Sequence, residues 1–265
     1  CQASTYNTLR LINRGRPKMQ ELKNLFEQQP TNIIKQIHPD DVMYVPNGDA
    51  HYYGVGYSAL KCVKLAMLAA SKSDLNAILD FPCGHGRVLR NLKAAFPNAE
   101  ITACDLDKKA VDCCAELFSA IPFYSSQNPE EIKIDRQFDL IWCGSLLTHL
   151  DSKYWLGFIK FFYDHLIRGG IVVFSVHGRY VAECFKNGHN YGLPSHKVTS
   201  ILNDYQRQGF GYQDYDGAAN YGISVSSSAW VHSHLEAIPN LRKLLYLEKG
   251  WDNHHDIVAC QRVSG

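Results

Sequence analysis

The sequence Ile78-Leu79-Asp80-Phe81-Pro82-Cys83-Gly84-His85-Gly86-Arg87 decides the fold. It begins as a short apolar strand, ends that strand on the carboxylate of Asp80, and turns through Gly84 and Gly86 into a predicted helix over 88–96. Glycines at such a turn let the backbone approach a ligand, and the free N–H groups of the following helix attract anions. The stretch therefore predicts a ligand site at the carboxyl end of the first strand of an α/β sheet.

Strands and single helices alternate along the chain beyond this turn. Apolar runs predict strands over 77–80, 99–104, 122–124, 138–143 and 171–176. Strands joined by single helices form a parallel sheet with helices on both faces. Two further strand-like segments, 241–248 and 256–263, are separated by too few residues for a crossover helix. We therefore expect them to pair antiparallel at one side of the sheet.

Apolar spacings of three and four residues also predict helices outside this alternation. One short helix is expected over 20–29, and another is expected from about Ser58. A long helix enters through Asp151-Ser152 and is expected to end at Gly169-Gly170. A stretch rich in Gly, Tyr, Ser and His then breaks the rhythm, with a single amphipathic helix expected around 198–205.

Length and composition favour one domain. The chain has 265 residues, of which 46% are hydrophobic, enough for a sizeable core and too many for a disordered protein. We expect a single domain over 1–265 with an N-terminal extension over 1–50 and a cap or acceptor-binding insertion over 178–240. The formal net charge is +1, which argues against a strongly basic groove for duplex nucleic acid.

Cysteine usage and hydropathy indicate a reducing compartment. The nine cysteines contain no Cys-x-x-Cys motif, and several lie in apolar segments, where cysteine is a small hydrophobic residue. No run of 18 apolar residues predicts a membrane span, and the first residues lack the apolar stretch of a secretory signal. The sequence therefore predicts a cytoplasmic protein with free thiols and no membrane span.

Two carboxylates indicate which ligand the turn holds. A dinucleotide site would have a third glycine where Leu89 stands, and Asp80 would repel a pyrophosphate. Asp80 instead suits a cationic group such as an α-ammonium, and Asp105, which ends the second strand, can accept both hydroxyls of a ribose. An amino-acid ammonium together with a ribose is the polar outline of S-adenosylmethionine.

The order of the motifs resembles that of the class I S-adenosylmethionine-dependent methyltransferases. The resemblance covers roughly 75–178 and the closing strand pair, and it implies a Rossmann-like, mostly parallel seven-stranded sheet with helices on both faces and a C-terminal antiparallel strand pair. Its motifs are Asp80-x-x-Cys83-Gly84-x-Gly86, Asp105-Leu106-Asp107, Phe138-Asp139-Leu140-Ile141-Trp142-Cys143 and Leu166-x-x-Gly169-Gly170. The family usually has a glycine where Pro82 stands, so the loop backbone is expected to differ there.

The resemblance also implies the residues that hold the cofactor. Asp80 and the loop with Pro82, Cys83, Gly84 and Gly86 would hold the methionine end, and Asp105 would hold the ribose. Other positions implied to lie against the cofactor are Leu106 beside the adenine, Ser126 with Ser125 and Gln127 at the adenine edge, and Cys143 with Gly144 on the floor. Tyr57, with Tyr52 and Tyr53, is predicted either to form an aromatic lid or to pack in the core.

Two histidines are candidates for the general base that a hydroxyl acceptor needs. His149 follows the fourth strand and His177 follows the fifth, and histidine titrates near neutrality. Each is alternatively a loop histidine bonded to the backbone, and this alternative is favoured for His177. Segments similar to Gly-Ser-Leu-x-Thr-His and Gly-Trp-Asp-x-His in glycan-modifying members point to O-methylation of a small-molecule or saccharide hydroxyl.

Other functions remain open on the sequence. These are methylation of a nucleic acid or of nitrogen in another acceptor, cofactor binding without catalysis, and NAD-dependent oxidoreduction. The pairs His232-x-His234 and His254-His255 are possible metal ligands, but no acid or cysteine stands at a supporting spacing, so solvated histidines are favoured and no metal is predicted.

Overall fold

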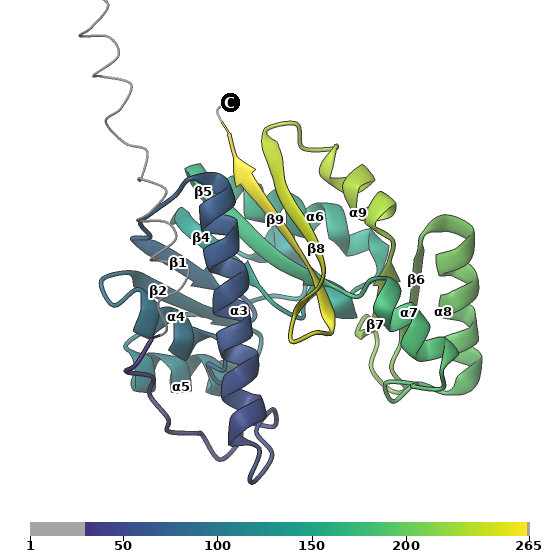
Figure 1. The fold of residues 1–265 in the computed structure, drawn as a ribbon, viewed down its shortest axis with the longest axis horizontal. Coiled ribbons are helices and arrows are strands. Elements are labelled where there is room, and N and C mark those ends of the chain that lie inside the picture. The colour runs from purple at the N-terminus through teal and green to yellow at the C-terminus, as the bar shows by residue number, and fades with distance from the viewer. Residues whose placement is uncertain (1–29, 264–265) are drawn as a thin grey trace, which may run out of the picture.

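The structure is a computed structural model that describes residues 30–263. A seven-stranded sheet in the order β3-β2-β1-β4-β5-β9-β8 runs through the molecule (Figure 1). Its strands are β1 (Ala77–Asp80), β2 (Glu100–Asp105), β3 (Ile121–Tyr124), β4 (Phe138–Cys143), β5 (Leu166–Val176), β8 (Leu241–Trp251) and β9 (His255–Arg262). The first five are parallel, and β9 pairs antiparallel with both β5 and β8. The predicted Rossmann-like class I methyltransferase fold is confirmed.

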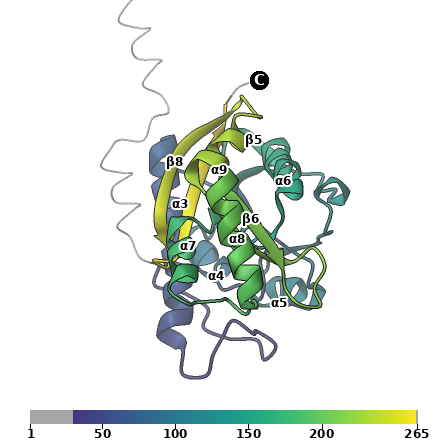
Figure 2. The same ribbon diagram turned by 90° about the vertical axis from the view of Figure 1, so that its right-hand side faces the viewer.

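Helices cover both faces of this sheet (Figures 1 and 2). One apolar core joins the sheet to α3 (Asp49–Ala70), α4 (Leu89–Ala95) and α5 (Lys108–Phe118). A second core joins the opposite face to α6 (Ser152–His165) and α9 (Ser228–Leu235). Alternate residues of β4 show why, because Leu140 and Trp142 lie in the first core and Ile141 and Cys143 lie in the second.

A smaller unit lies beside the sheet, past the β8 and β9 side (Figure 1). It consists of α7 (Arg179–Lys186), α8 (Ser195–Gln208), β6 (Phe210–Asp214) and β7 (Gly222–Ser226), with an apolar core of its own. The amphipathic helix predicted around 198–205 is confirmed as α8, whereas α7, β6 and β7 were not predicted. A side chain on Gly211 would place its Cβ 2.1 Å from the carbonyl oxygen of Ile201 on α8, so this glycine permits β6 to pack closely on the helix. In the sequence, a glycine-rich composition of this kind indicates a loop.

The helix expected from Ser58 begins nine residues earlier, at Asp49. Gly54 and Gly56 weaken the helical pattern, yet a Cβ on Gly56 would lie 2.3 Å from the carbonyl oxygen of Arg87. This glycine therefore lets α3 pass close to the start of α4. As a result, Tyr52, Tyr53 and Tyr57 lie on the helix and not on a segment that precedes it.

Other boundaries differ more locally. Helix α6 ends at His165, and Gly169-Gly170 lies inside β5, where the register against β4 shifts between Phe138 and Leu140. The glycines thus mark a strand irregularity and not the end of the helix. Two 3-10 turns, η1 (Pro129–Glu131) and η2 (Leu147–His149), connect the strands. The helix predicted over 20–29 lies outside the described residues.

The described cysteines are unpaired. Eight are free, and all of them except Cys184 are buried. This agrees with the prediction that they serve as small core residues. Among residues 30–263, no helix combines the length and apolar character needed to cross a membrane.

Candidate functional site

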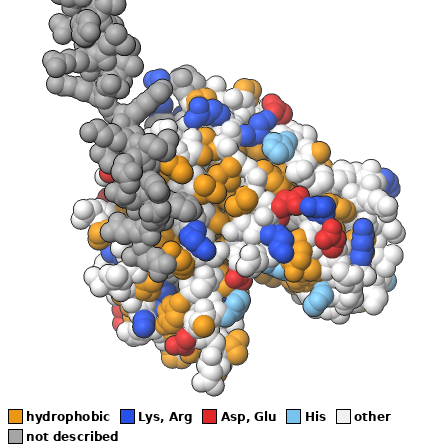
Figure 3. All heavy atoms as spheres, in the orientation of Figure 1, with side chains coloured by type: hydrophobic (Ala, Val, Ile, Leu, Met, Phe, Trp, Pro, Cys, Tyr) orange, Lys and Arg blue, Asp and Glu red, His pale blue; other side chains and the backbone are white. Residues whose placement is uncertain are grey.

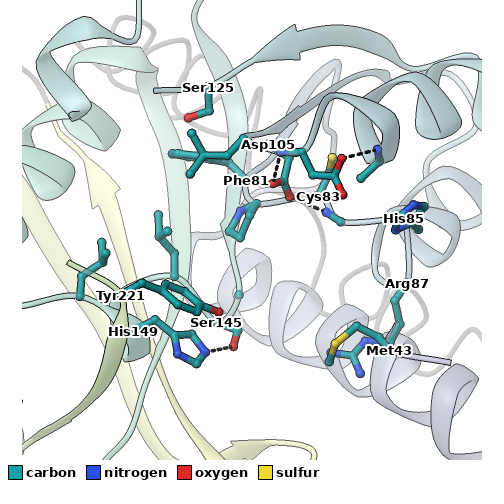
Figure 4. A pocket seen from close by; sticks show the side chains of 18 of the residues that line it. Met43, Phe81, Cys83, His85, Arg87, Asp105, Ser125, Ser145, His149 and Tyr221 are labelled. Carbon is teal, nitrogen blue, oxygen red and sulfur yellow. Dashed lines mark hydrogen bonds between the residues drawn. The ribbon is translucent and has the colours of Figure 1, made fainter. Parts of the chain in front are cut away.

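A pocket of about 600 Å³ opens at the carboxyl ends of the parallel strands (Figure 4). The turns after β1, β2, β3 and β4 each contribute wall residues, because the carboxyl ends of parallel strands share one edge. The predicted residues that line it are Pro82, Cys83, Gly84, Asp105, Leu106, Ser125, Ser126, Gln127, Gly144 and His149. Its size lies within the range that binds small molecules and cofactors.

The glycine loop is held in place by its neighbours. Gly84 has φ +48° with open space where a Cβ would stand, and its N–H donates to Oδ2 of Asp105 at 2.8 Å. Its carbonyl oxygen accepts a hydrogen bond from Sγ of Cys114 at 3.3 Å. A Cβ on Gly86, at φ +83°, would come within 2.4 Å of the Phe118 ring. Gly84 therefore leaves room at the pocket, whereas Gly86 permits packing and does not line it.

Asp105 and Asp80 differ in how their carboxylates are satisfied. Asp105 accepts from Gly84 and also, through Oδ1, from the N–H of Asp107 at 3.0 Å. Asp80 is 1% exposed, and neither of its oxygens has a hydrogen-bond partner. Burial, reinforced by the charge of Asp105, raises the pKa of Asp80 well above its ordinary value. Asp80 does not line the pocket, but an unpaired buried carboxyl beside it favours a cationic ligand group.

His149 is half-buried at the other end of the pocket, beside Ser145 and Tyr221 (Figure 4). Its Nδ1 lies 2.7 Å from the carbonyl oxygen of Gly222. Because a carbonyl only accepts, Nδ1 carries the hydrogen, and Nε2 is left as an acceptor for the Ser145 hydroxyl at 3.3 Å. Burial lowers the pKa of His149, against the opposing effect of the Gly222 hydrogen bond, so the ring is neutral near pH 7. The Tyr221 ring stacks on it with centroids 5.0 Å apart.

The remaining predicted site residues do not line the pocket. Tyr57 packs against the core from α3, and Cys143 is buried beneath the sheet edge. His177 is 4% exposed, and its Nδ1 lies 3.2 Å from the carbonyl oxygen of Ser224. Burial lowers the pKa of His177 well below its ordinary value, helped by neighbouring histidines. It has the backbone-bonded position that the sequence favoured for it.

Several wall residues were not among the site residues predicted from the sequence. Val42 and Met43 belong to a polar, proline-containing stretch that was predicted from the sequence to be part of the N-terminal extension. In the structure they line the pocket, and they are 88% and 53% exposed. Arg87 closes the same side as a cation next to the glycine loop (Figure 4). Tyr221 approaches from the connection between β6 and β7, within the insertion over 178–240 for which the sequence predicted a cap or acceptor-binding role. Only the fold brings these three regions together.

Comparison with known proteins agrees with the fold and the motifs. Residues 79–172 match a family model described as a methyltransferase domain. No curated protein matches the chain in sequence.

Solved structures of three proteins share the fold at low identity. An S-adenosylmethionine-dependent methyltransferase from Clostridium acetobutylicum is 17% identical, with a TM-score of 0.51 over 83% of this chain and 95% of that one. DesVI from Streptomyces venezuelae is 15% identical, with a TM-score of 0.53 over 83% of this chain and 100% of that one. CalS10 from Micromonospora echinaspora, an amino pentose methyltransferase with bound S-adenosylmethionine, is 13% identical, with a TM-score of 0.55 over 85% and 100%.

Proposed function

We propose that this chain, a class I S-adenosylmethionine-dependent methyltransferase, methylates a hydroxyl of a saccharide or another small molecule. The observation that carries the proposal is the ring of His149 at the pocket wall, with Nδ1 committed to a carbonyl and Nε2 unprotonated, its lone pair shared only with the Ser145 hydroxyl. A hydroxyl acceptor must lose its proton as it is methylated, which is the task of such a base.

Residues that line the pocket, together with two that lie behind its wall, match the chemical groups of the cofactor. Asp80, whose buried carboxyl has no hydrogen-bond partner, supplies a counter-charge once the α-ammonium lies beside it and favours its ionised form, and the cation of Arg87 suits the α-carboxylate. The loop of Pro82, Cys83 and Gly84 leaves room for the methionine end of S-adenosylmethionine. Cys143 supports the floor from below, and Gly144 lines it.

The nucleoside end of the cofactor fits the neighbouring strand ends. Asp105 uses one acceptor position on each oxygen within the protein and keeps others for the two ribose hydroxyls. Leu106 is 53% exposed at the pocket and offers an apolar surface to the adenine. Ser126 offers hydrogen bonds to the adenine edge. Tyr57 packs against the core and does not line the pocket, so no cofactor contact is proposed for it.

The chemistry requires little of the protein beyond alignment and one proton transfer. S-adenosylmethionine supplies an electrophilic methyl group on a sulfonium centre. His149 holds its Nε2 toward the pocket in a single tautomer, takes the proton of the acceptor hydroxyl, and passes it to solvent. The Ser145 hydroxyl, which bonds the same nitrogen in this structure, is displaced from it when the acceptor hydroxyl binds. Tyr221 stacks on the ring and offers an aromatic face to a sugar or a planar acceptor.

The surface charges support a small acceptor over a nucleic acid. Acidic and basic side chains are interspersed on the face drawn in Figure 3. Affinity for a nucleic acid comes largely from the attraction of Lys and Arg to its backbone phosphates. The formal net charge of this chain is only +1, so that attraction is weak. A labelled-methyl transfer screen over saccharides, phenols and amines, with the methylated atom located by NMR, tests the proposal. Transfer to a hydroxyl supports it, whereas transfer only to nitrogen or to nucleic acid overturns it.

The cofactor assignment has its own test. Asp105→Asn should weaken S-adenosylhomocysteine binding by about tenfold or more, because charge-assisted hydrogen bonds to the ribose are lost. Asp112→Asn is the matched control, because this exposed carboxylate on α5 bonds Tyr124 and lies outside the pocket. Titration calorimetry measures both. Equal affinity of wild type and Asp105→Asn would remove Asp105 from the ribose site.

A further inference from the structure

Three histidines from distant parts of the chain meet next to the pocket. His177 follows β5, and His254 and His255 lie where β8 turns into β9. One nitrogen of each ring lies within 4.8 Å of those of the other two. Ring centroids of His177 and His255 are 4.8 Å apart, and those of His177 and His254 are 5.8 Å apart. The sequence offered no third ligand near His254-His255, but the fold supplies one from the end of another strand.

The turn itself directs two consecutive histidines to one side. Asp252 and Asn253 have φ of +54° and +53°, and the N–H of His254 donates to the carbonyl oxygen of Trp251 at 3.0 Å. Two successive left-handed residues make the tight turn typical of a two-residue hairpin. In a regular strand neighbouring side chains point to opposite faces, so this turn is what brings both imidazoles to His177.

Hydrogen bonds fix which nitrogens are available. Nδ1 of His177 lies 3.2 Å from the carbonyl oxygen of Ser224, so it carries the hydrogen and Nε2 keeps its lone pair. Nδ1 of His255 lies 3.2 Å from Oγ of Ser175, which also accepts from the N–H of Ser145 at 2.7 Å. A hydroxyl oxygen accepts two hydrogen bonds, so it can hold His255 in the matching tautomer. Outer hydrogen bonds of this kind orient metal-bound histidines.

We propose that His177, His254 and His255 bind a transition-metal ion, preferably Zn²⁺, with its fourth position open to water. Three imidazoles with one open position are an established zinc arrangement. Zinc–nitrogen distances of about 2.0–2.1 Å put tetrahedral ligands about 3.3 Å apart, so nitrogens that lie within 4.8 Å of one another must approach by no more than about 1.5 Å on binding. His254 and His255 are half-buried, which gives the ion a path from solvent and His254 room to move at the turn.

The ion would join two parts of the fold behind the acceptor end of the pocket. His177 bonds β7 through Ser224, whereas the other two ligands belong to the β8–β9 turn. The ring centroids of His177 and His149 are 6.2 Å apart, so the proposed metal site lies directly beside the proposed general base. None of the three ligands lines the pocket, and the site is therefore separate from the cofactor positions.

Zinc titration of the chelator-treated full chain tests the proposal. We expect one equivalent of Zn²⁺ to bind the wild type and to raise its melting temperature, because an ion that binds only the folded state stabilises it. His254→Gln should weaken zinc affinity by at least about tenfold and abolish the rise. His196→Gln, at an exposed position on α8, is the matched control and should leave both unchanged.

Cobalt provides the second readout. Co²⁺ in a four-coordinate histidine site absorbs in the visible, and this band should appear with the wild type and His196→Gln but not with His254→Gln. Circular dichroism verifies that the His254→Gln variant is folded. The proposal is overturned if the wild type binds no zinc at micromolar concentration, or if His254→Gln binds it as tightly as the wild type, since the ion would then lie elsewhere, for example on thiols.

Discussion

His149 is the residue whose replacement should separate binding from chemistry. His149→Gln keeps a hydrogen-bond donor for the Gly222 carbonyl but provides no base, so methyl transfer should fall by about 10²–10⁴-fold. S-adenosylhomocysteine affinity should change little, because the proposed cofactor contacts lie at the other end of the pocket. Single-turnover transfer and calorimetry on the same preparation measure the two effects. His232→Gln, on α9 away from the pocket, is the control. Unchanged turnover in His149→Gln would exclude it as the base.

Among the elements, β4 is joined to its neighbours through one carboxylate. Asp139 accepts from Lys72 after α3 at 2.8 Å and from the N–H groups of Asn76 and Ala77 at the start of β1, each at 3.0 Å. Burial alone would raise the pKa of Asp139, but these hydrogen bonds outweigh it and lower the pKa. Asp139→Asn should therefore cost about 2–3 kcal/mol of unfolding free energy near pH 7.

The sign of the pH dependence follows from the lowered pKa. The unfolded chain takes up the proton first as pH falls, so the stabilisation by Asp139 is complete above about pH 4 and is lost as pH falls through the folded value. The difference in unfolding free energy between wild type and Asp139→Asn, measured with urea, should begin to shrink below about pH 4 and disappear once pH is below the folded pKa of Asp139. The control is Glu100→Gln, whose carboxylate pairs with Arg136 at 68% exposure and should contribute no more than about 1 kcal/mol. A pH-independent difference would contradict this account.

At the scale of the whole molecule, the sequence predicts the pocket residues at the ends of strands. It does not predict the wall residues that distant segments contribute through tertiary packing. Gly84 and Asp105, which line the pocket, could be predicted because each lies at or just beyond the end of a buried strand in the alternating pattern. Met43 was not predicted, because nothing local to it marks a surface that faces a pocket formed elsewhere.

Glycines caused the wrong element boundaries for a related reason. Gly56 weakened the prediction of the start of α3, although it is the residue that lets α3 pass close to Arg87. Gly169 predicted the end of a helix and lies instead in the irregular part of β5. In both places the glycine serves a contact or a conformation that depends on a distant segment, which composition and periodicity do not encode.

The pocket wall at residues 40–43 is the clearest case of assembly across the molecule. The Tyr52 hydroxyl on α3 donates to Oδ2 of Asp41 at 2.5 Å, and Asp41 accepts through Oδ1 from the N–H of Met43 at 3.0 Å. Arg90 on α4 donates to the carbonyl oxygens of Ile34 and Gln36 at 2.7 and 3.1 Å. Asp41 and Tyr52 are both buried, so this segment is positioned by two helices and not by its own sequence.

Tyr52→Phe should therefore loosen the wall without touching the cofactor contacts. Loss of a buried, charge-assisted hydrogen bond costs about 1.5–3 kcal/mol, part of which should appear as a weakening of S-adenosylhomocysteine binding by about threefold to tenfold. Amides of 40–43 should exchange faster in the free variant and regain protection when the ligand binds. Tyr124→Phe removes an exposed tyrosine–aspartate hydrogen bond on β3 and should change neither measurement. If exchange at 40–43 is the same in Tyr52→Phe as in the wild type, Tyr52 does not hold this wall, and the segment is positioned chiefly by Arg90.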